Sequence, residues 1–195
     1  MQIGSNSAII DNDFLNHVVE MRKNDDEMVL IVSNVFGELE IEPAIHPLVF
    51  EKEVLKFNGR IKRLFDESVI KKLTFEDIHN NDQNKKSYYS FLVLELYKKL
   101  TGETLNTNGQ TVFDFWRTMH SLGEIHSLAT CLLCGCGVFL SDDKDSQILK
   151  RIIEETFLTT ILVHNRQAVV ALLREKGTSM SRKNLQSFSH VRVSF

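Results

Sequence analysis

Residues 121–145 read SLGEIHSLATCLLCGCGVFLSDDKD, and this stretch decides the fold class. Its first half repeats apolar residues at helical spacing, namely Leu122, Ile125, Ala129, Leu132, Leu133 and Cys136. Gly135 and Gly137 are expected to end that helix. Residues 138–140 then form a short apolar run that is typical of a buried strand, and Asp142-Asp143 precede a second helix that reaches about Thr156.

The same alternation appears on both sides of this stretch. Residues 160–163 form another apolar run, and Asn165 is placed to cap a helix that reaches about Lys176. Near the start, residues 7–10 predict a strand, and a helix is expected from about Phe14 to Lys23. Strands that alternate with helices predict a parallel sheet covered on both faces. In such sheets, ligands bind beyond the carboxyl ends of the strands.

The segment between residues 26 and 56 is less regular. A helix is predicted for residues 26–36 and is expected to stop at Gly37, although its Val-Leu-Ile-Val core fits a strand equally well. Residues 38–41 resemble a short strand. Pro47 stands where a first helical turn tolerates proline, so a helix is expected from there to about Lys56.

We expect one α/β domain over residues 1–195, with a mostly helical insertion at about 57–115 and a C-terminal extension at about 177–195. Within the insertion, residues 85–100 predict a helix that Gly102 closes. The segment from residue 179 to the C-terminus combines cationic and aromatic side chains and contains no acid. It fits a disordered tail or a segment that a partner orders, and the pattern does not choose between them.

Composition places the chain among ordinary globular proteins. Of its 195 residues, 43% are hydrophobic and 25% are charged. The net charge of −3 argues against a protein that coats nucleic acid without sequence specificity. We see no leader segment and no apolar run of membrane-spanning length, and the three cysteines do not suggest a disulfide framework. Cys131, Cys134 and Cys136 are interpreted as buried hydrophobes rather than zinc ligands. A cytoplasmic protein without membrane contact is expected.

Carboxylates lie at or near the ends of several predicted strands and helices: Asp11, Asp13, Glu51, Glu53, Glu124, Asp142, Asp143 and Asp145. Each has a structural alternative. Asp13 fits an N-cap, Ser121-x-x-Glu124 has the form of a capping box, and the acids at 142 and 143 fit caps of the next helix. Their shared position at one sheet edge favours a site for Mg²⁺ or Mn²⁺, because crowded carboxylates need a cation or must take up protons.

Four segments together resemble PIN-like domains. Residues 9–15 (IIDNDFL) resemble the opening strand and its aspartate, and residues 36–53 resemble the second strand and a Glu-bearing helix. Residues 122–129 (LGEIHSLA) resemble the helix that carries the third acid. Residues 139–145 (FLSDDKD) resemble the closing strand and its aspartates. The segments occur in the family's order and cover about half of the chain.

The resemblance implies a three-layer sandwich with a central, mainly parallel sheet and a metal-dependent ribonuclease activity. It assigns catalysis to Asp11, Glu53, Glu124 and Asp143, and metal binding to Asp11, Glu124, Asp142 and Asp143. Asp13, Glu51 and Asp145 are further candidates, and Lys144 and Arg117 are candidate phosphate contacts. It also implies an RNA substrate, a toxin role neutralised by an antitoxin or another regulatory protein, and a homodimer. The long insertion and the Asp at position 13 depart from the family pattern.

An alternative hypothesis is that the chain has the PIN-like fold but no catalytic activity. On that reading the chain is a catalytically inactive PIN-like module that binds or regulates a partner, with the insertion as its distinctive feature. Cleavage of RNA in the presence of Mn²⁺ distinguishes the two readings. A DNA-directed nuclease with the same chemistry is a third alternative, which a comparison of the two polymers tests.

Overall fold

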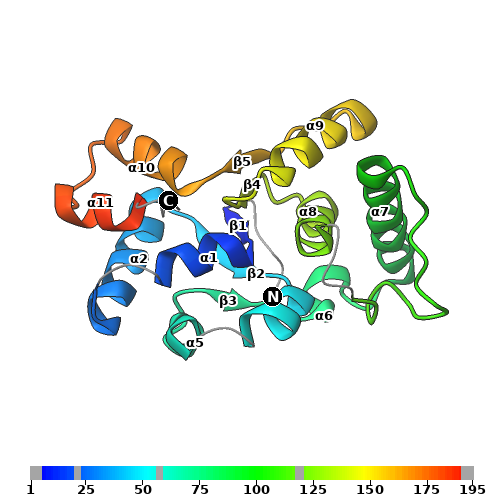
Figure 1. Ribbon diagram of the computed structural model, residues 1–195, viewed down its shortest axis with the longest axis horizontal. Helices are drawn as coiled ribbons and strands as arrows, with labels where there is room; N and C mark the ends of the chain where they lie inside the picture. Colours follow the sequence, from blue (N-terminus) through cyan, green and yellow to red (C-terminus); the bar gives the residue numbers. More distant parts are fainter. Residues whose placement is uncertain (1–5, 20–22, 56–58, 117–120, 190–195) are drawn as a thin grey trace, which may run out of the picture.

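A computed structural model describes residues 6–19, 23–55, 59–116 and 121–189, and Figure 1 shows its layers. The centre is a five-stranded sheet in which every neighbouring pair of strands is parallel. Helices cover both faces, so the protein is an α/β sandwich of three layers, as the alternation of strands and helices predicts. The strands are β1 (Ser7–Ile10), β2 (Glu42–Ile45), β3 (Lys71–Lys72), β4 (Val138–Leu140) and β5 (Leu162–His164).

The helical segments vary widely in length, and one of them is a π-helical turn, η1. They are α1 (Asn12–Val19), α2 (Asp25–Leu39), α3 (Pro47–Val49), η1 (Phe50–Val54), α5 (Gly59–Asp66), α6 (Phe75–His79), α7 (Gln83–Thr101), α8 (Leu122–Cys134), α9 (Asp145–Phe157), α10 (Arg166–Glu175) and α11 (Arg182–Ser189). None of the helices in the described ranges has both the length and the apolar composition needed to cross a bilayer.

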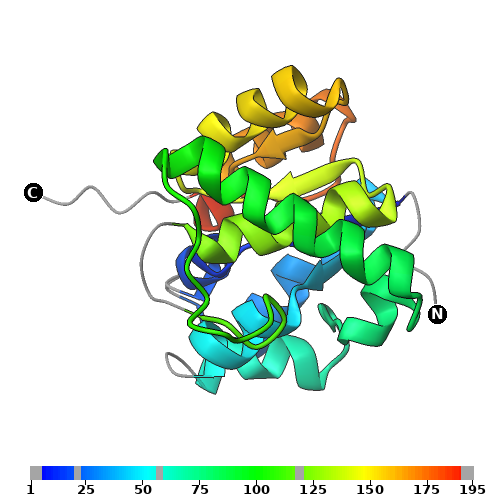
Figure 2. The ribbon, with the colours of Figure 1, turned by 90° about the vertical axis from the view of Figure 1, so that its right-hand side faces the viewer.

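The sheet separates two apolar cores because successive strand residues face opposite ways. In β1, Ala8 and Ile10 pack with α1, α2, α5, α10 and α11, whereas Ile9 packs with α6, α7, α8 and α9. In β4, Phe139 and Leu140 divide in the same way. Helix α8 lies directly on the second face of the sheet, and α7 lies outside α8, as both views show (Figure 2).

Most helices begin and end where local signals place them. Helix α7 ends with Gly102 at a left-handed φ of 76°, α8 ends at Gly135 with φ 69°, and the Asn165 side chain accepts a hydrogen bond from the Ala168 amide. Helix α2 is confirmed as a helix, but it continues through Gly37 to Leu39. The short strand expected at residues 38–41 was therefore wrong. The end of α2 and the following turn occupy these positions, and β2 begins at Glu42.

The segment expected to be a helical insertion contributes to the sheet as well. Its residues Lys71 and Lys72 form β3, which pairs with Ala44 and Ile45 of β2. A strand of two lysines has no alternating apolar pattern, so periodicity could not detect it. The remainder of the described segment is mainly helical. It consists of α5, α6 and the long α7, followed by a loop that includes Phe113.

The C-terminal extension is ordered by the protein itself over residues 182–189. Helix α11 packs on α2 and α10, and it buries Leu185 and Phe188 in the first core. Phe188 also meets the Phe14 ring edge-on at 5.9 Å between centroids. The two alternatives for this segment, a disordered tail or a partner-ordered one, are therefore wrong for residues 182–189. Residues 190–195 lie outside the described ranges.

A buried hydrogen-bonded chain joins the end of β2 to α7 and α8. The Leu48 amide donates to Nδ1 of His46 (3.2 Å), so His46 carries its proton on Nε2 and donates to Tyr89 Oη (2.8 Å). The Tyr89 hydroxyl then donates to Nδ1 of His126 (2.7 Å). Burial lowers the pKa of His126 to about 3 and, with His126 nearby, lowers that of His46 well below its usual value. Both imidazoles are therefore neutral.

Removing the central hydroxyl of this chain should destabilise the fold. Tyr89→Phe is expected to lower the free energy of unfolding by about 1–3 kcal/mol, because it leaves the polar nitrogens of two buried imidazoles without a partner. Urea denaturation measures the change. The matched control is Tyr88→Phe, at a neighbouring ring that is 47% exposed, and it should stay within about 0.5 kcal/mol of the wild type. Equal effects of the two substitutions would contradict a stabilising role for the hydrogen bonds from His46 through Tyr89 to His126.

Candidate metal centre at the switch point of the sheet

The strand order β3-β2-β1-β4-β5 creates a switch point between β1 and β4. From β1 the chain proceeds outward to β2 and β3 on one side, and later to β4 and β5 on the other. The crevice beyond the carboxyl ends of such a strand pair is where open α/β sheets bind ligands. Asp11 directly follows β1, and Ser141, Asp142 and Asp143 directly follow β4. The sequence therefore places four polar residues at the position the topology favours.

Asp11 is the buried acid at the centre of this edge, with only 3% of its surface exposed. It accepts hydrogen bonds from the Asn12 amide (2.7 Å) and from the Ser141 hydroxyl (3.2 Å), so it links β1 to the loop after β4. Burial raises the pKa of Asp11 well above its usual value, and the nearby Glu124 raises it further, with smaller contributions from two other acids. The Asp11 carboxyl is therefore poised to take up a proton or a cation.

Glu124 reaches the same region from α8. Burial raises its pKa from 4.5 to about 7, and repulsion by Asp143 and Glu53 adds to the rise. The capping-box alternative for Glu124 was wrong, because Ser121 makes no side-chain cap and stands at a left-handed φ of 51°. The Ser121 hydroxyl donates to Asp145 instead, at 2.8 Å. Glu124 is thus part of a repulsive cluster of acids.

Glu53 approaches Glu124 through a gap that Gly123 leaves open. The Oε1 atom of Glu53 lies 3.0 Å from the point where a Cβ on Gly123 would stand. Glu53 belongs to η1, and π-helical turns occur often at functional sites. Its neighbour Glu51 is exposed and pairs with Lys72 at 3.5 Å. Glu51 and Glu53 were both candidates for the site acid of this helix, and Glu53 is the one that lies beside Asp11 and Glu124.

Asp13 and Asp143 also belong to the cluster, because both raise the pKa of Glu124. Asp13 lies inside the first turn of α1, which begins at Asn12, so the N-cap alternative for it was wrong. Burial raises the pKa of Asp13, and repulsion by Asp143 is the next cause. Asp143 accepts the Asp145 amide at 2.7 Å, but the N-cap residue of α9 is Lys144, so neither Asp142 nor Asp143 is the N-cap that the capping alternative predicts. One carboxylate oxygen of Asp143 is used in that contact.

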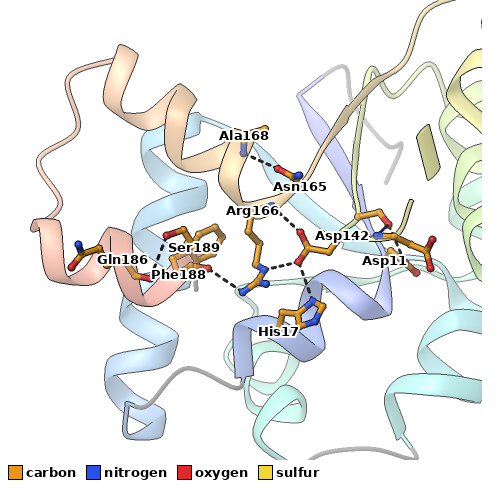
Figure 3. Close-up of polar contacts among 11 residues, drawn as sticks. Asp11, His17, Asp142, Asn165, Arg166, Ala168, Gln186, Phe188 and Ser189 are labelled. Carbon is orange, nitrogen blue, oxygen red and sulfur yellow. Dashed lines mark hydrogen bonds and ion pairs between the residues drawn. The ribbon is translucent and has the colours of Figure 1, made fainter. Parts of the chain in front are cut away.

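Asp142 has a different environment, shown in Figure 3. Its Oδ2 accepts from Nε of Arg166 at 2.5 Å and lies 3.1 Å from Nδ1 of His17, and its Oδ1 accepts from the Arg166 amide at 3.1 Å. The Arg166 side chain is 2% exposed and also donates to the Phe188 carbonyl at 3.3 Å. Asp142 therefore joins the loop after β4 to α1, α10 and α11. Its predicted role as a metal ligand stays a prediction.

The predicted phosphate contacts divide between described and undescribed residues. Lys144 is exposed at the start of α9, next to Asp143. Arg117 lies outside the described residues. Asp145 opens α9 and accepts the Ser121 hydroxyl, which makes it a link between α8 and α9.

The donor chemistry of the cluster suits a hard divalent cation. Asp11, Glu53, Glu124 and Asp143 offer only carboxylate oxygens, the ligands that Mg²⁺ prefers. The raised pKa values of Asp11 and Glu124 arise from burial and from repulsion by neighbouring acids, both of which a cation would relieve. The Oδ1 atom of Asn12 is another buried oxygen and accepts no hydrogen bond. In the ranges the structure describes, no group of three or more His, Cys, Asp or Glu side chains is arranged to hold a metal ion.

Several residues that shape this edge carry no motif that reveals them. Arg166 appears in the sequence as an ordinary cation at a helix start, and His17 as a residue on a helix surface. Gly123 has no distinct signal beyond its place in the motif, although its missing Cβ is what gives Glu53 room. Ser141 looks like a turn residue, yet its hydroxyl connects Asp11, the Asp143 amide and Ser146. The nearest sequence signal is an arginine at the first position of the helix after β5, two residues beyond the end of that strand.

No protein-family model, no curated protein and no solved structure matches this chain. The geometry of the sheet edge and the residues gathered there are therefore what point to a function.

Proposed function

We propose that the protein is a PIN-like, Mg²⁺- or Mn²⁺-dependent ribonuclease. The observation that carries the proposal is the convergence of Asp11 and Glu124 at the switch point, where burial and neighbouring acids raise the pKa of both. Groups with strongly perturbed pKa values that share a crevice are typical of functional sites. The resemblance of four segments to PIN-like domains supports the same reaction class.

In this proposal, Asp11, Glu124 and Asp143 hold the cation. A bound divalent ion lowers the pKa of its water and stabilises the oxygen that departs from phosphorus. Glu53 lies beside Asp11 and Glu124 and adds negative charge, and Gly123 gives it room. Ser141 holds Asp11 in place through its hydroxyl. We assign Asp142 to positioning, because Arg166 and His17 already contact its oxygens.

The resemblance to PIN-like domains indicates RNA as the substrate, and the cations near the acids suit a nucleic acid. Lys52 and Lys144 lie on segments that leave this sheet edge, and Lys72 is the last residue of β3, so all three suit a polyanionic substrate. Single-stranded or loop RNA fits a groove that separates its bases. A toxin role with an antitoxin partner and a homodimer follow from the resemblance alone, and we retain them as parts of the proposal.

Cleavage of single-stranded RNA tests the proposal. The wild type with Mn²⁺ should cleave it, whereas the Asp11→Asn, Asp143→Asn double variant should lose tenfold or more of the rate, because the amides remove two negative ligands. Gel analysis of labelled RNA and DNA measures the rates and identifies the preferred polymer. The matched control is Asp66→Asn, an exposed acid that lies 4.0 Å from Lys62, which should leave the rate unchanged.

Two outcomes would count against the proposal, the first against the site and the second against the activity. Cleavage that persists unchanged in the double variant would show that the acids are not the site. The absence of cleavage of either polymer, with no Mn²⁺ binding by calorimetry, would favour the inactive binding module.

A further inference from the structure

A concave site lies at the same edge of the sheet as the acidic cluster, beyond the carboxyl ends of β2 and β3. It is a pocket of about 520 Å³ formed by α3, η1, the segment after β3 and the loop around residue 113. Ligand pockets typically have volumes of roughly 300–1,000 Å³. The pocket has aromatic walls from Phe75 and Phe113 and a charged rim from Glu51, Lys52, Lys72 and Asp114.

The aromatic walls are held in place from behind. The Phe113 ring stacks on buried Tyr89 at 5.3 Å between centroids and 16° between planes, and it meets Phe75 edge-on at 5.2 Å. Phe75 in turn contacts His46 edge-on at 5.5 Å. Both phenylalanines remain partly exposed on the pocket side. The hydrogen-bonded chain of His46, Tyr89 and His126 therefore supports two rings that are preorganised and still accessible.

The cations at the rim differ in how they are held. The Lys72 ammonium lies 4.5 Å above the centroid of the Phe50 ring and 3.5 Å from Glu51, so its position is fixed by two contacts. Lys52 forms no ion pair within the described residues. One positioned and one unpaired ammonium beside aromatic rings are suited to a ligand that has both a flat π-face and a phosphate.

The pocket and the acidic cluster are neighbours on one surface. Strands β1 and β2 are adjacent, and adjacent strands lie about 4.8 Å apart, so the ends of β1 and β2 are separated by roughly that distance. Segment η1 connects the two sites directly. Its Glu53 approaches Gly123 beside Glu124, while its Glu51 and Lys52 line the pocket.

We propose that this pocket binds a nucleobase of the substrate, next to the phosphodiester that the acidic cluster would cleave. The base stacks on Phe75 or Phe113, and Lys52 and Lys72 contact the adjoining phosphate. This inference rests on the proposed nuclease function, which it extends from the reaction to the recognition of the substrate. It also gives β3 and the segment up to Asp114 a role, because that segment supplies most of the pocket.

Binding can be tested without cleavage. The probes are a fluorescently labelled, single-stranded oligoribonucleotide and the same oligomer with an abasic position, and both are titrated into the Asp11→Asn, Asp143→Asn variant in EDTA. Adding Phe113→Leu, which removes the π-face and keeps the apolar volume, should weaken binding of the intact oligomer about 5- to 150-fold. Adding Lys52→Gln should weaken it and reduce its salt dependence. Phe91→Leu, at a half-exposed ring of α7 that meets Phe157 of α9 and does not line the pocket, is the matched control and should have no effect.

The outcomes separate this inference from the nuclease proposal. Unchanged affinity in both Phe113→Leu and Lys52→Gln would overturn the pocket, even if the wild type cleaves RNA. Weakened binding in these variants would support the pocket, even if the wild type cleaves nothing. Because Phe113→Leu alters packing against Tyr89, adenosine monophosphate is also titrated into the folded wild type and followed by NMR. Shifts at residues 52 and 113 are expected, and shifts confined to other segments would count against the proposal.

Discussion

Replacing Arg166 with methionine is expected to lower the free energy of unfolding by about 3–5 kcal/mol. The Arg166 guanidinium is buried and pairs with Asp142 at 2.5 Å, while it also donates to the Phe188 carbonyl. Methionine keeps much of the apolar stem but leaves a largely buried carboxylate without its main counter-ion. Such an uncompensated charge is among the most destabilising changes in a protein interior. Urea denaturation measures the loss.

Two further variants show whether the loss of stability in Arg166→Met comes from breaking the Asp142–Arg166 ion pair. Arg151→Met replaces an exposed arginine on α9 and should change stability by no more than about 0.5 kcal/mol. Combining Arg166→Met with Asp142→Leu removes both charges and should recover much of the loss, because a well-packed apolar pair can equal a buried ion pair. If the double variant is as unstable as the sum of its parts, then the Asp142–Arg166 pair is not the source of the effect.

The same pair connects a peripheral helix to the acidic centre. Helix α11 is attached through Phe188, whose carbonyl accepts from Arg166, and Arg166 holds Asp142 in the loop that also presents Asp143. A change at the C-terminal helix can therefore reach the loop through two contacts. In Arg166→Met, amide hydrogen exchange should accelerate first in residues 182–189, because they lose this attachment while the central strands keep their pairing.

Local patterns in the sequence predict much of the fold. Strands β1 and β4 are short apolar runs followed by acids. Because predicted helices lie next to each run in the sequence, each run predicts a buried strand. Helix ends marked by Gly102 and Gly135 were also predicted, because only a few residues adopt left-handed backbone at low cost. Strand β3 was not predicted, since its two lysines carry no apolar signal and its pairing with β2 is a tertiary effect. The π-helical turn that carries Glu53 has no known local signature either.

The candidate site was predictable as a set of residues but not as a set of contacts. Glu124 satisfied two patterns at once, a capping box and an acid of the cluster, and only the conformation of Ser121 separates them. Asp142 and Arg166 lie 24 positions apart, and no spacing rule connects them. From the sequence, both Asp142 and Asp143 were therefore predicted as metal ligands, with catalysis assigned to Asp143 alone. Tertiary structure assigns one of them to an ion pair and the other to the repulsive cluster.

Removing one charge from that cluster should stabilise the metal-free protein at neutral and higher pH. At about pH 8, Glu124→Gln is expected to raise the free energy of unfolding by roughly 3 kcal/mol. Burial, with repulsion by Asp143, raises the folded-state pKa of Glu124 to about 7, whereas a glutamate in the unfolded chain ionises near 4.5. Between these values the folded protein keeps a proton that the unfolded chain has lost. Stability of the wild type therefore falls as the pH rises through this window, and an amide avoids that loss.

Urea denaturation in EDTA at about pH 4.5 and about pH 8 measures the difference between the two proteins, so that other titrating groups largely cancel. The gain from Glu124→Gln should be small at the lower pH and complete at the higher. Glu154→Gln, which alters only a helical pair with Lys150, is the control and should show no such pH dependence. With saturating Mn²⁺ at the higher pH, the wild type should gain more stability than Glu124→Gln. The ionised Glu124 carboxylate, which its acidic neighbours repel in the metal-free protein, then binds the cation. An effect of Glu124→Gln that is equal at both pH values would mean that Glu124 titrates like an ordinary glutamate, and the acids would then not form one cluster.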